Sequence, residues 1–133
     1  MVLVDTTVWI DFFGGADRPH AAALEDLIAG DEDICVCGVI LAETLQGIRK
    51  DSDYRKTRDY FSHLILLPMS EATFLRAADI YRNLRRKGIT IRKPVDCMIA
   101  STAIEHNLPL LHNDRDFDRI ALHSKLRILK FPG

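Results

Sequence analysis

The chain has 133 residues, of which 47% are hydrophobic and 28% charged, and its formal net charge is −1. This composition is typical of one globular domain spanning residues 1–133. Because the charges balance, the chain is not a protein that binds nucleic acid through an overall positive charge. Three cysteines without zinc-site spacing (Cys35, Cys37 and Cys97) argue against a disulfide framework. No apolar run approaches the ~20 residues of a membrane helix and the N-terminus lacks the basic region of a signal peptide, so we expect a cytoplasmic protein with no membrane partner.

Short apolar runs alternate with helical patterns along the whole chain. The runs predict strands at residues 2–4, 34–37, 64–67, 110–111 and 128–131. Helical spacing of apolar residues predicts helices at 8–13, 19–29, 39–48, 53–63, 70–87 and 94–107, and a short helix that ends at Leu122. This alternation indicates an α/β fold in which a parallel sheet is wrapped by helices.

The first run, Val2-Leu3-Val4, leads directly into Asp5. A short continuous apolar run predicts a strand buried on both faces, and Asp5 then lies at its carboxyl end, where open α/β sheets place their ligand crevice. The hydroxyl of Thr6 or Thr7 is expected to cap the helix that follows.

Three further acids are predicted at the same edge of the sheet. Glu43 lies about one turn into the helix after the second strand, Asp96 in the first turn of the helix opened by Pro94, and Asp114 three residues after the fourth strand. Asp116 is close enough to Asp114 to reach the same place.

Each acid also has a purely structural interpretation. Asp96 near a helix start is favourable for the helix dipole, Asp114 lies in a turn where aspartate is common, and Glu43 could be a solvated helix residue. Asp5 is the hardest to explain in this way, because an ionised carboxylate at the end of a buried strand needs a partner. The coincidence of four acids at crevice positions favours a shared site.

Converging carboxylates repel one another, so either one of them is protonated or a cation lies among them. An all-oxygen set of ligands suits Mg²⁺ or Mn²⁺. Such an ion can activate water for attack on phosphorus, and the predicted chemistry is therefore phosphodiester hydrolysis.

Four sequence segments together resemble a known family. They are Val4-Asp5-Thr6-Thr7-Val8-Trp9-Ile10-Asp11, Leu41-Ala42-Glu43, Pro94-Val95-Asp96-Cys97-Met98-Ile99-Ala100, and Leu110-Leu111-His112-Asn113-Asp114-Arg115-Asp116-Phe117. In this order and in a chain of this length they resemble the PIN-domain ribonucleases, and among them the VapC-type toxins of bacterial toxin–antitoxin pairs.

The resemblance implies a single PIN-like domain with a central five-stranded parallel sheet and helices on both faces. It implies an endoribonuclease that depends on Mg²⁺ or Mn²⁺. The catalytic acids that it implies are Asp5, Glu43, Asp96 and Asp114, with Asp5, Asp96 and Asp114 as metal ligands and Thr7 and Asp116 as auxiliary residues.

The resemblance also implies partners: an RNA substrate, a second copy of the chain in a homodimer, and an inhibitory cognate antitoxin whose C-terminal tail covers the acidic groove. One departure from the family's pattern is His112, which stands where many members have Thr or Ser. It could add a titrating group near Asp114.

A basic cluster precedes Asp96 in the sequence. Its members at the end of the long helix and in the following loop include Arg85, Arg86, Lys87, Arg92 and Lys93. One interpretation is a solvated helix end, where basic residues are favourable. The other is a track for RNA phosphates that leads to Asp96.

Three rival interpretations differ in class from a nuclease. A haloacid-dehalogenase-type phosphatase also has an aspartate at the end of its first strand, but it needs a second aspartate two residues later, where this chain has Thr7. A receiver-like binding module needs adjacent acids early in the chain, and Asp5 stands alone. A PIN fold without nuclease activity that serves as an interaction module is a third alternative, against which the complete set of acids argues.

Overall fold

The computed structural model describes residues 1–132 and contains seven helices and four strands within that range. In chain order these elements are β1 (Val2–Val4), α1 (Thr6–Phe13), α2 (Pro19–Ala29), β2 (Ile34–Cys37), α3 (Gly38–Gln46), α4 (Asp51–Phe61), β3 (Ile65–Leu67), α5 (Glu71–Arg86), α6 (Val95–Glu105), β4 (Leu110–Leu111) and α7 (Arg115–Leu122).

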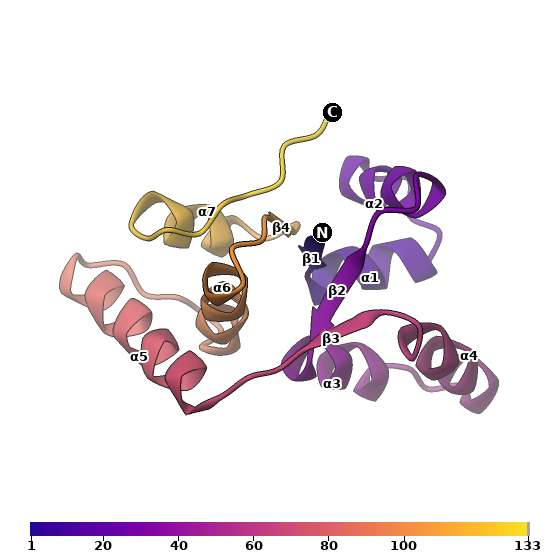
Figure 1. Cartoon of the computed structure of the whole chain (residues 1–133), viewed down its shortest axis with the longest axis horizontal. Coiled ribbons are helices and arrows are strands. Elements are labelled where there is room, and N and C mark those ends of the chain that lie inside the picture. Colours follow the sequence, from indigo (N-terminus) through magenta and orange to yellow (C-terminus); the bar gives the residue numbers. More distant parts are fainter. Residues whose placement is uncertain (133) are drawn as a thin grey trace.

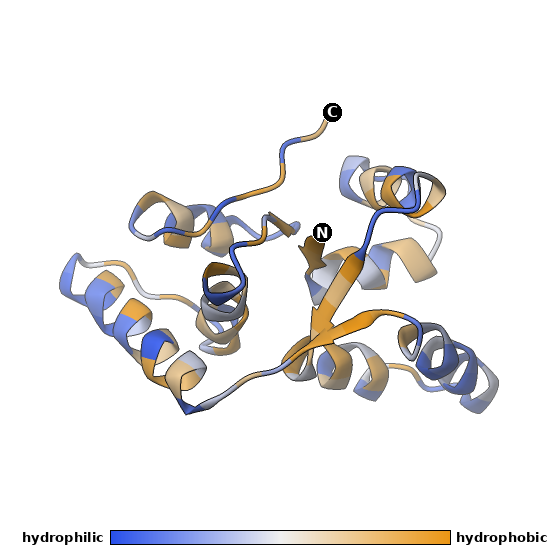
Figure 2. Cartoon of the chain, viewed as in Figure 1, coloured by the Kyte–Doolittle hydropathy of each residue, from blue (hydrophilic) through white to orange (hydrophobic). Residues whose placement is uncertain are grey.

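The sheet is parallel throughout, with the strand order β3-β2-β1-β4. Every residue of β1, β2 and β4 is buried. Because successive side chains of a strand point to opposite faces, complete burial means that helices cover both faces of the sheet (Figure 1). The strands are strongly hydrophobic, whereas α4 and much of α5 are hydrophilic (Figure 2).

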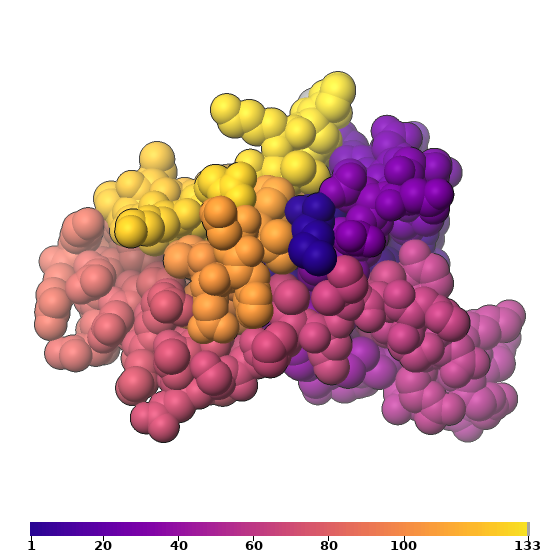
Figure 3. Space-filling view, viewed as in Figure 1, coloured from indigo at the N-terminus to yellow at the C-terminus, as the bar shows by residue number. Residues whose placement is uncertain are grey.

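Strand β1 lies at the centre of the molecule. It pairs with β2 through Val2 and Ile34 and with β4 through Leu3 and Leu110. In the space-filling view only a small indigo patch of the N-terminal segment remains visible, enclosed by later parts of the chain (Figure 3). Strand β1 therefore ends between β2 and β4, and Asp5 follows directly after it at the carboxyl edge of the sheet.

The prediction of a fifth strand at residues 128–131 is wrong. Ile128 forms only an isolated parallel bridge with Leu110, supported by hydrogen bonds from Leu110 N to Arg127 O and from Leu129 N to Leu110 O. Strand β4 is only two residues long, so a neighbouring strand can form few hydrogen bonds with it. Pro132 has no backbone N–H and cannot donate to further pairing. The sheet consequently ends at β4.

Helix starts carry the local signals that bring acids to the sheet edge. Asp5, rather than Thr6 or Thr7, is the N-cap of α1, and its carboxylate accepts the Thr7 N–H. Asp114 caps α7 in the same way by accepting the Asp116 N–H. Away from the edge, α5 packs along α6. Ser70 is the N-cap of α5, as predicted, and forms a capping box with Thr73.

Within residues 1–132 no helix is both long enough and apolar enough to cross a membrane.

Trp9 anchors α1 to the sheet. Its ring is fully buried, contacts Phe61 edge-on, and stacks on Phe13, while its indole N–H donates to Val4 O at 3.1 Å. The same side chain therefore supplies apolar contact and satisfies a carbonyl beside Asp5.

We expect Trp9→Phe to lower the free energy of unfolding by about 2 kcal/mol, because the smaller ring leaves a void and the Val4 carbonyl loses its donor. Urea denaturation followed by circular dichroism measures this change. Phe13→Leu, at a side chain in the same cluster that is 42% exposed, is the control and should cost less than about 1 kcal/mol. Equal effects of the two substitutions would contradict the role of the indole N–H.

Candidate active site

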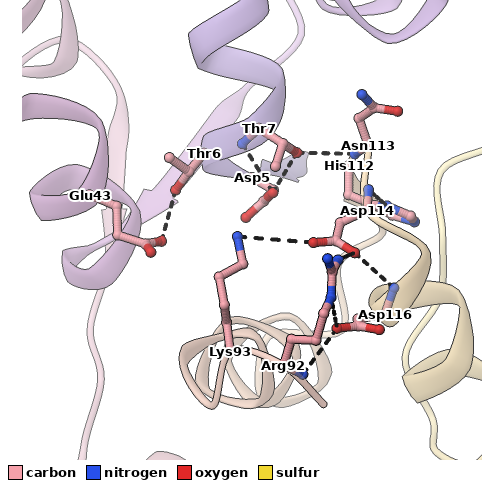
Figure 4. A network of polar contacts seen from close by, with 10 residues as sticks. All are labelled: Asp5, Thr6, Thr7, Glu43, Arg92, Lys93, His112, Asn113, Asp114 and Asp116. Atoms are coloured by element: carbon pink, nitrogen blue, oxygen red, sulfur yellow. Dashed lines mark hydrogen bonds and ion pairs between the residues drawn. The ribbon is translucent and has the colours of Figure 1, made fainter. Parts of the chain in front are cut away.

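Asp5 is buried at the end of β1 and is held in one orientation by Thr7 (Figure 4). Its Oδ2 accepts hydrogen bonds from the Thr7 hydroxyl at 2.6 Å and from the Thr7 N–H at 3.1 Å. Burial raises the pKa of Asp5, and these hydrogen bonds act in the opposite direction. The carboxylate is thus fixed but poorly solvated.

Thr7 also joins the ends of β1 and β4. Its Oγ1 accepts the N–H of Asn113, two residues beyond β4, at 3.1 Å. Because one hydroxyl donates to Asp5 and accepts from Asn113, Thr7 sets the spacing between Asp5 and the turn that carries Asp114. Thr7, predicted as an auxiliary residue, therefore connects Asp5 to the turn after β4.

Asp96 is the least satisfied acid of the site. It lies in the first turn of α6 and is buried, and within residues 1–132 its Oδ2 has no hydrogen-bond partner. Burial raises its pKa to about 7, and the charges of Asp5, Asp114 and Glu43 contribute in the same direction, whereas Lys93 opposes them. All four predicted catalytic acids consequently belong to one electrostatic cluster.

Glu43 projects from α3 toward the same cluster (Figure 4). The hydroxyl of Thr6 donates to its Oε1 at 3.0 Å. Thr6 and Thr7, adjacent at the start of α1, therefore orient two different acids, Glu43 and Asp5.

Asp114 and Asp116 lie at the start of α7, beside two cations. Asp114 Oδ1 accepts the Asp116 N–H at 3.0 Å and the Arg92 Nη2–H at 3.1 Å. Asp116 Oδ2 accepts from the Arg92 N–H at 3.2 Å and from its Nε–H at 3.4 Å, and the two aspartates raise the pKa of Arg92. Lys93 Nζ lies 4.0 Å from Asp114 Oδ2.

His112 supports the turn between β4 and α7. Its Nδ1 accepts the Asp114 N–H at 3.0 Å, and its Nε2 lies 3.1 Å from Asp118 Oδ1. A neutral ring with the proton on Nε2 satisfies both contacts. The ring also packs against Phe117, so His112 fixes the backbone of Asp114 from behind.

The donor set fits a hard divalent cation. Carboxylate oxygens of Asp96, Asp114 and Asp116 all lie within 4.8 Å of one another. The predicted ligands Asp96 and Asp114 are in this group, together with Asp116, which was predicted as an auxiliary residue. The Asp96 Oδ2, which has no hydrogen-bond partner within residues 1–132, and the all-oxygen donor set are compatible with a hard divalent cation.

The five predicted RNA-binding cations have different surroundings. Arg85 lies over the ring of Tyr81, Arg86 donates to Asn83, and Lys87 Nζ lies 3.4 Å from His123 Nδ1. Only Arg92 and Lys93 reach the acids. Sequence reasoning missed their pairing with Asp114, because nothing in the sequence places the loop before α6 beside the start of α7.

Cys97, next to Asp96, is buried, and burial raises the pKa of its thiol to about 11. The side chain is thus a protonated apolar filler behind the site, as are the buried Cys35 and Cys37.

Comparison with known proteins identifies the family. The PIN domain family matches residues 2–122, which is most of the chain. The chain belongs to the PIN domain family. Ribonuclease VapC11 of Mycobacterium tuberculosis is 34% identical over 133 residues, covering 98% of this chain and 99% of that protein. Ribonuclease VapC17 of the same species is 29% identical over 122 residues, covering 90% and 86% of the two chains.

Solved structures share the PIN fold. A chain in the crystal structure of VapBC2 from Rickettsia felis bound to a DNA fragment from their promoter superposes with a TM-score of 0.75 at 22% identity, covering 99% of this chain and 100% of that one. DNA-bound VapBC from Salmonella typhimurium gives 0.74 at 24% identity, with 96% of each chain covered. The family assignment excludes the phosphatase and receiver interpretations of the sequence.

The raised pKa of Asp96 predicts how stability depends on pH. The pKa is about 7 in the folded protein and near 3.8 when the carboxyl group is unperturbed. Between these values the folded protein retains a proton that the unfolded chain has lost, so the free energy of unfolding of the metal-free protein falls as the pH rises. We expect Asp96→Asn to flatten this fall and to be about 1 to 2 kcal/mol more stable than wild type at about pH 8, a value that allows for partial solvent screening.

Chemical denaturation in EDTA from about pH 5 to about pH 8 measures this dependence. Asp79→Asn, at an exposed position of α5, is the control and should retain the wild-type slope. An Asp96→Asn protein that loses stability with pH as steeply as wild type would show that Asp96 does not hold the shifted proton.

Proposed function

We propose that this protein is a metal-dependent endoribonuclease that acts as the toxin of a toxin–antitoxin pair. The observation that carries the proposal is the buried Asp96 carboxylate, whose Oδ2 has no hydrogen-bond partner within residues 1–132 and which feels the charges of Asp5, Glu43 and Asp114. Four acids on four separate elements have no structural need to converge at one place. The names of the VapC relatives, which are ribonucleases, support the same activity for this chain.

A divalent cation, Mg²⁺ or Mn²⁺, would be held by Asp96 and Asp114, with Asp5 or Asp116 completing the acidic set. When bound, such an ion neutralises the carboxylates and allows water to act as a nucleophile at neutral pH. The chain's own contribution is geometric: Thr7 and His112 fix Asp5 and the Asp114 backbone before substrate arrives.

Glu43 is suited to orient the attacking water. The Thr6 hydroxyl occupies its Oε1, which leaves Oε2 to accept a hydrogen bond from water. Arg92 and Lys93 lie on the open side of the cluster, where they can pair with the phosphate whose P–O bond is cleaved. Arg85, Arg86 and Lys87 would extend this positive track along the end of α5.

An antitoxin partner is part of the proposal. The structural neighbours include the toxin–antitoxin complex from Klebsiella pneumoniae, with a TM-score of 0.69, in addition to the VapBC complexes. A polypeptide tail that covered the acidic groove would deny RNA access to Asp96.

A homodimer is also proposed, and an apolar surface supports it. Leu66 on the edge strand β3 is 56% exposed, and Phe74 at the start of α5 is 43% exposed. Both line a hollow that also contains Val39, Leu67 and Met69. An apolar surface of this kind at an open sheet edge is typical of an interaction site.

Asp96→Asn is expected to abolish cleavage of RNA while leaving the protein folded, because the amide cannot hold a divalent cation among the remaining acids. Cleavage of structured RNAs with Mg²⁺ or Mn²⁺, with and without EDTA, measures the loss. The variant should be at least about 10³-fold less active, the effect of removing a metal ligand and its charge from a catalytic site.

Asp79→Asn serves again as the matched control and should cleave normally. If wild-type protein cleaves RNA equally well in EDTA, the metal requirement is wrong. If it cleaves no RNA under any condition, the alternative holds, in which the PIN fold is an interaction module without nuclease activity.

Leu66→Glu is expected to convert a dimer to a monomer, because a charge on the edge strand opposes burial against a second copy. Size-exclusion chromatography with light scattering measures the mass. Leu122→Glu, at a side chain that is 80% exposed on α7 and outside this surface, should leave the dimer intact. A monomeric wild-type protein, or a dimeric Leu66→Glu variant, would exclude this interface.

A further inference from the structure

Arg92 lies across the acidic cluster as an internal cation. Its Nη2 contacts Asp114 Oδ1 at 3.1 Å and its Nε contacts Asp116 Oδ2 at 3.4 Å (Figure 4). Its backbone N–H also donates to Asp116 Oδ2 at 3.2 Å. One residue therefore bridges the two acids at the start of α7 with its main chain and its side chain.

The two sides of this bridge differ strongly in exposure. The Arg92 side chain is 72% exposed, whereas the side chains of Asp114 and Asp116 are only 8% and 5% exposed. The solvent-exposed guanidinium of Arg92 thus covers the two buried carboxylates. Because water can solvate the guanidinium from its open side, its side-chain contacts with the two acids can be exchanged for contacts with another cation.

The acids that Arg92 bridges are also two of the three whose oxygens lie within 4.8 Å of one another. A guanidinium and a divalent cation on the same carboxylates would repel each other. Asp114 Oδ1 already accepts the Asp116 N–H and the Arg92 Nη2–H, so a divalent cation at this oxygen would have to displace the guanidinium. Occupation of Asp114 Oδ1 by the two cations is therefore competitive.

We propose that Arg92 is an exchangeable counter-ion, which holds Asp114 in the metal-free protein and releases it when a divalent cation binds. The inference rests on the proposed function. Asp116 remains the anchor, since the Arg92 N–H binds it independently of the guanidinium. The released guanidinium stays at the mouth of the site, where it is free to pair with a substrate phosphate in the bidentate geometry that arginine favours.

Calorimetric titration of the metal-free full chain with Mn²⁺ tests the exchange. Arg92→Gln is expected to bind Mn²⁺ about fivefold more tightly than wild type, because no counter-ion has to be displaced. Its melting temperature in EDTA should fall by about 2 to 4 °C, because the acids lose their internal cation. Both readouts are independent of RNA cleavage.

Two matched variants separate exchange from a general electrostatic effect. Arg92→Lys keeps the charge but not the planar fork, so under exchange its Mn²⁺ affinity should rise by about twofold. Lys93→Gln removes a charge that has only the 4.0 Å contact with Asp114, and its affinity should rise less than that of Arg92→Gln.

If Arg92→Gln and Lys93→Gln bind Mn²⁺ equally and Arg92→Lys binds like wild type, charge alone acts and the exchange is refuted. If wild-type protein binds no Mn²⁺ at millimolar concentration, the proposed metal site itself fails. These two failures are distinguishable, because only the second abolishes binding in every variant.

Discussion

The site depends on one constraint: the Asp96 carboxylate is buried, and residues 1–132 provide no donor for its Oδ2. Burial desolvates this carboxylate, and the charges of Asp5, Asp114 and Glu43 also disfavour its ionised form. Its pKa therefore rises to about 7. A protein retains such an arrangement only at some cost in stability. A cation bound among the acids would relieve the desolvation and the repulsion together.

Helix starts make this concentration of negative charge tolerable. Asp5 caps α1, Asp114 caps α7, and Asp96 lies in the first turn of α6, so the positive ends of three helices face the cluster. All three starts lie near the carboxyl ends of β1 and β4, where parallel sheets open their crevice. The backbone thus offsets part of the repulsion before any side chain or ion takes part.

The sequence predicted these features to the extent that they depend on local pattern. Apolar runs identified the four strands, and acids placed just after strands or at helix starts identified the cluster around Asp96. The fifth strand was wrong because pairing at Ile128 depends on the length of β4, which no local pattern reveals. The ion pair between Arg92 and Asp114 and the 2.6 Å contact between His20 Nε2 and Asp11 Oδ2 were not predicted, since both depend on how separate elements pack.

The buried cysteines have a consequence for how opening of the fold is observed. Cys35, Cys37 and Cys97 are free and buried, and burial raises the pKa of each thiol. Thiolate, the form that reacts with alkylating reagents, is therefore scarce while the chain is folded. Because Cys35 and Cys37 belong to β2 and Cys97 adjoins Asp96 in α6, alkylation at each position reports separately on exposure of the sheet and of the site.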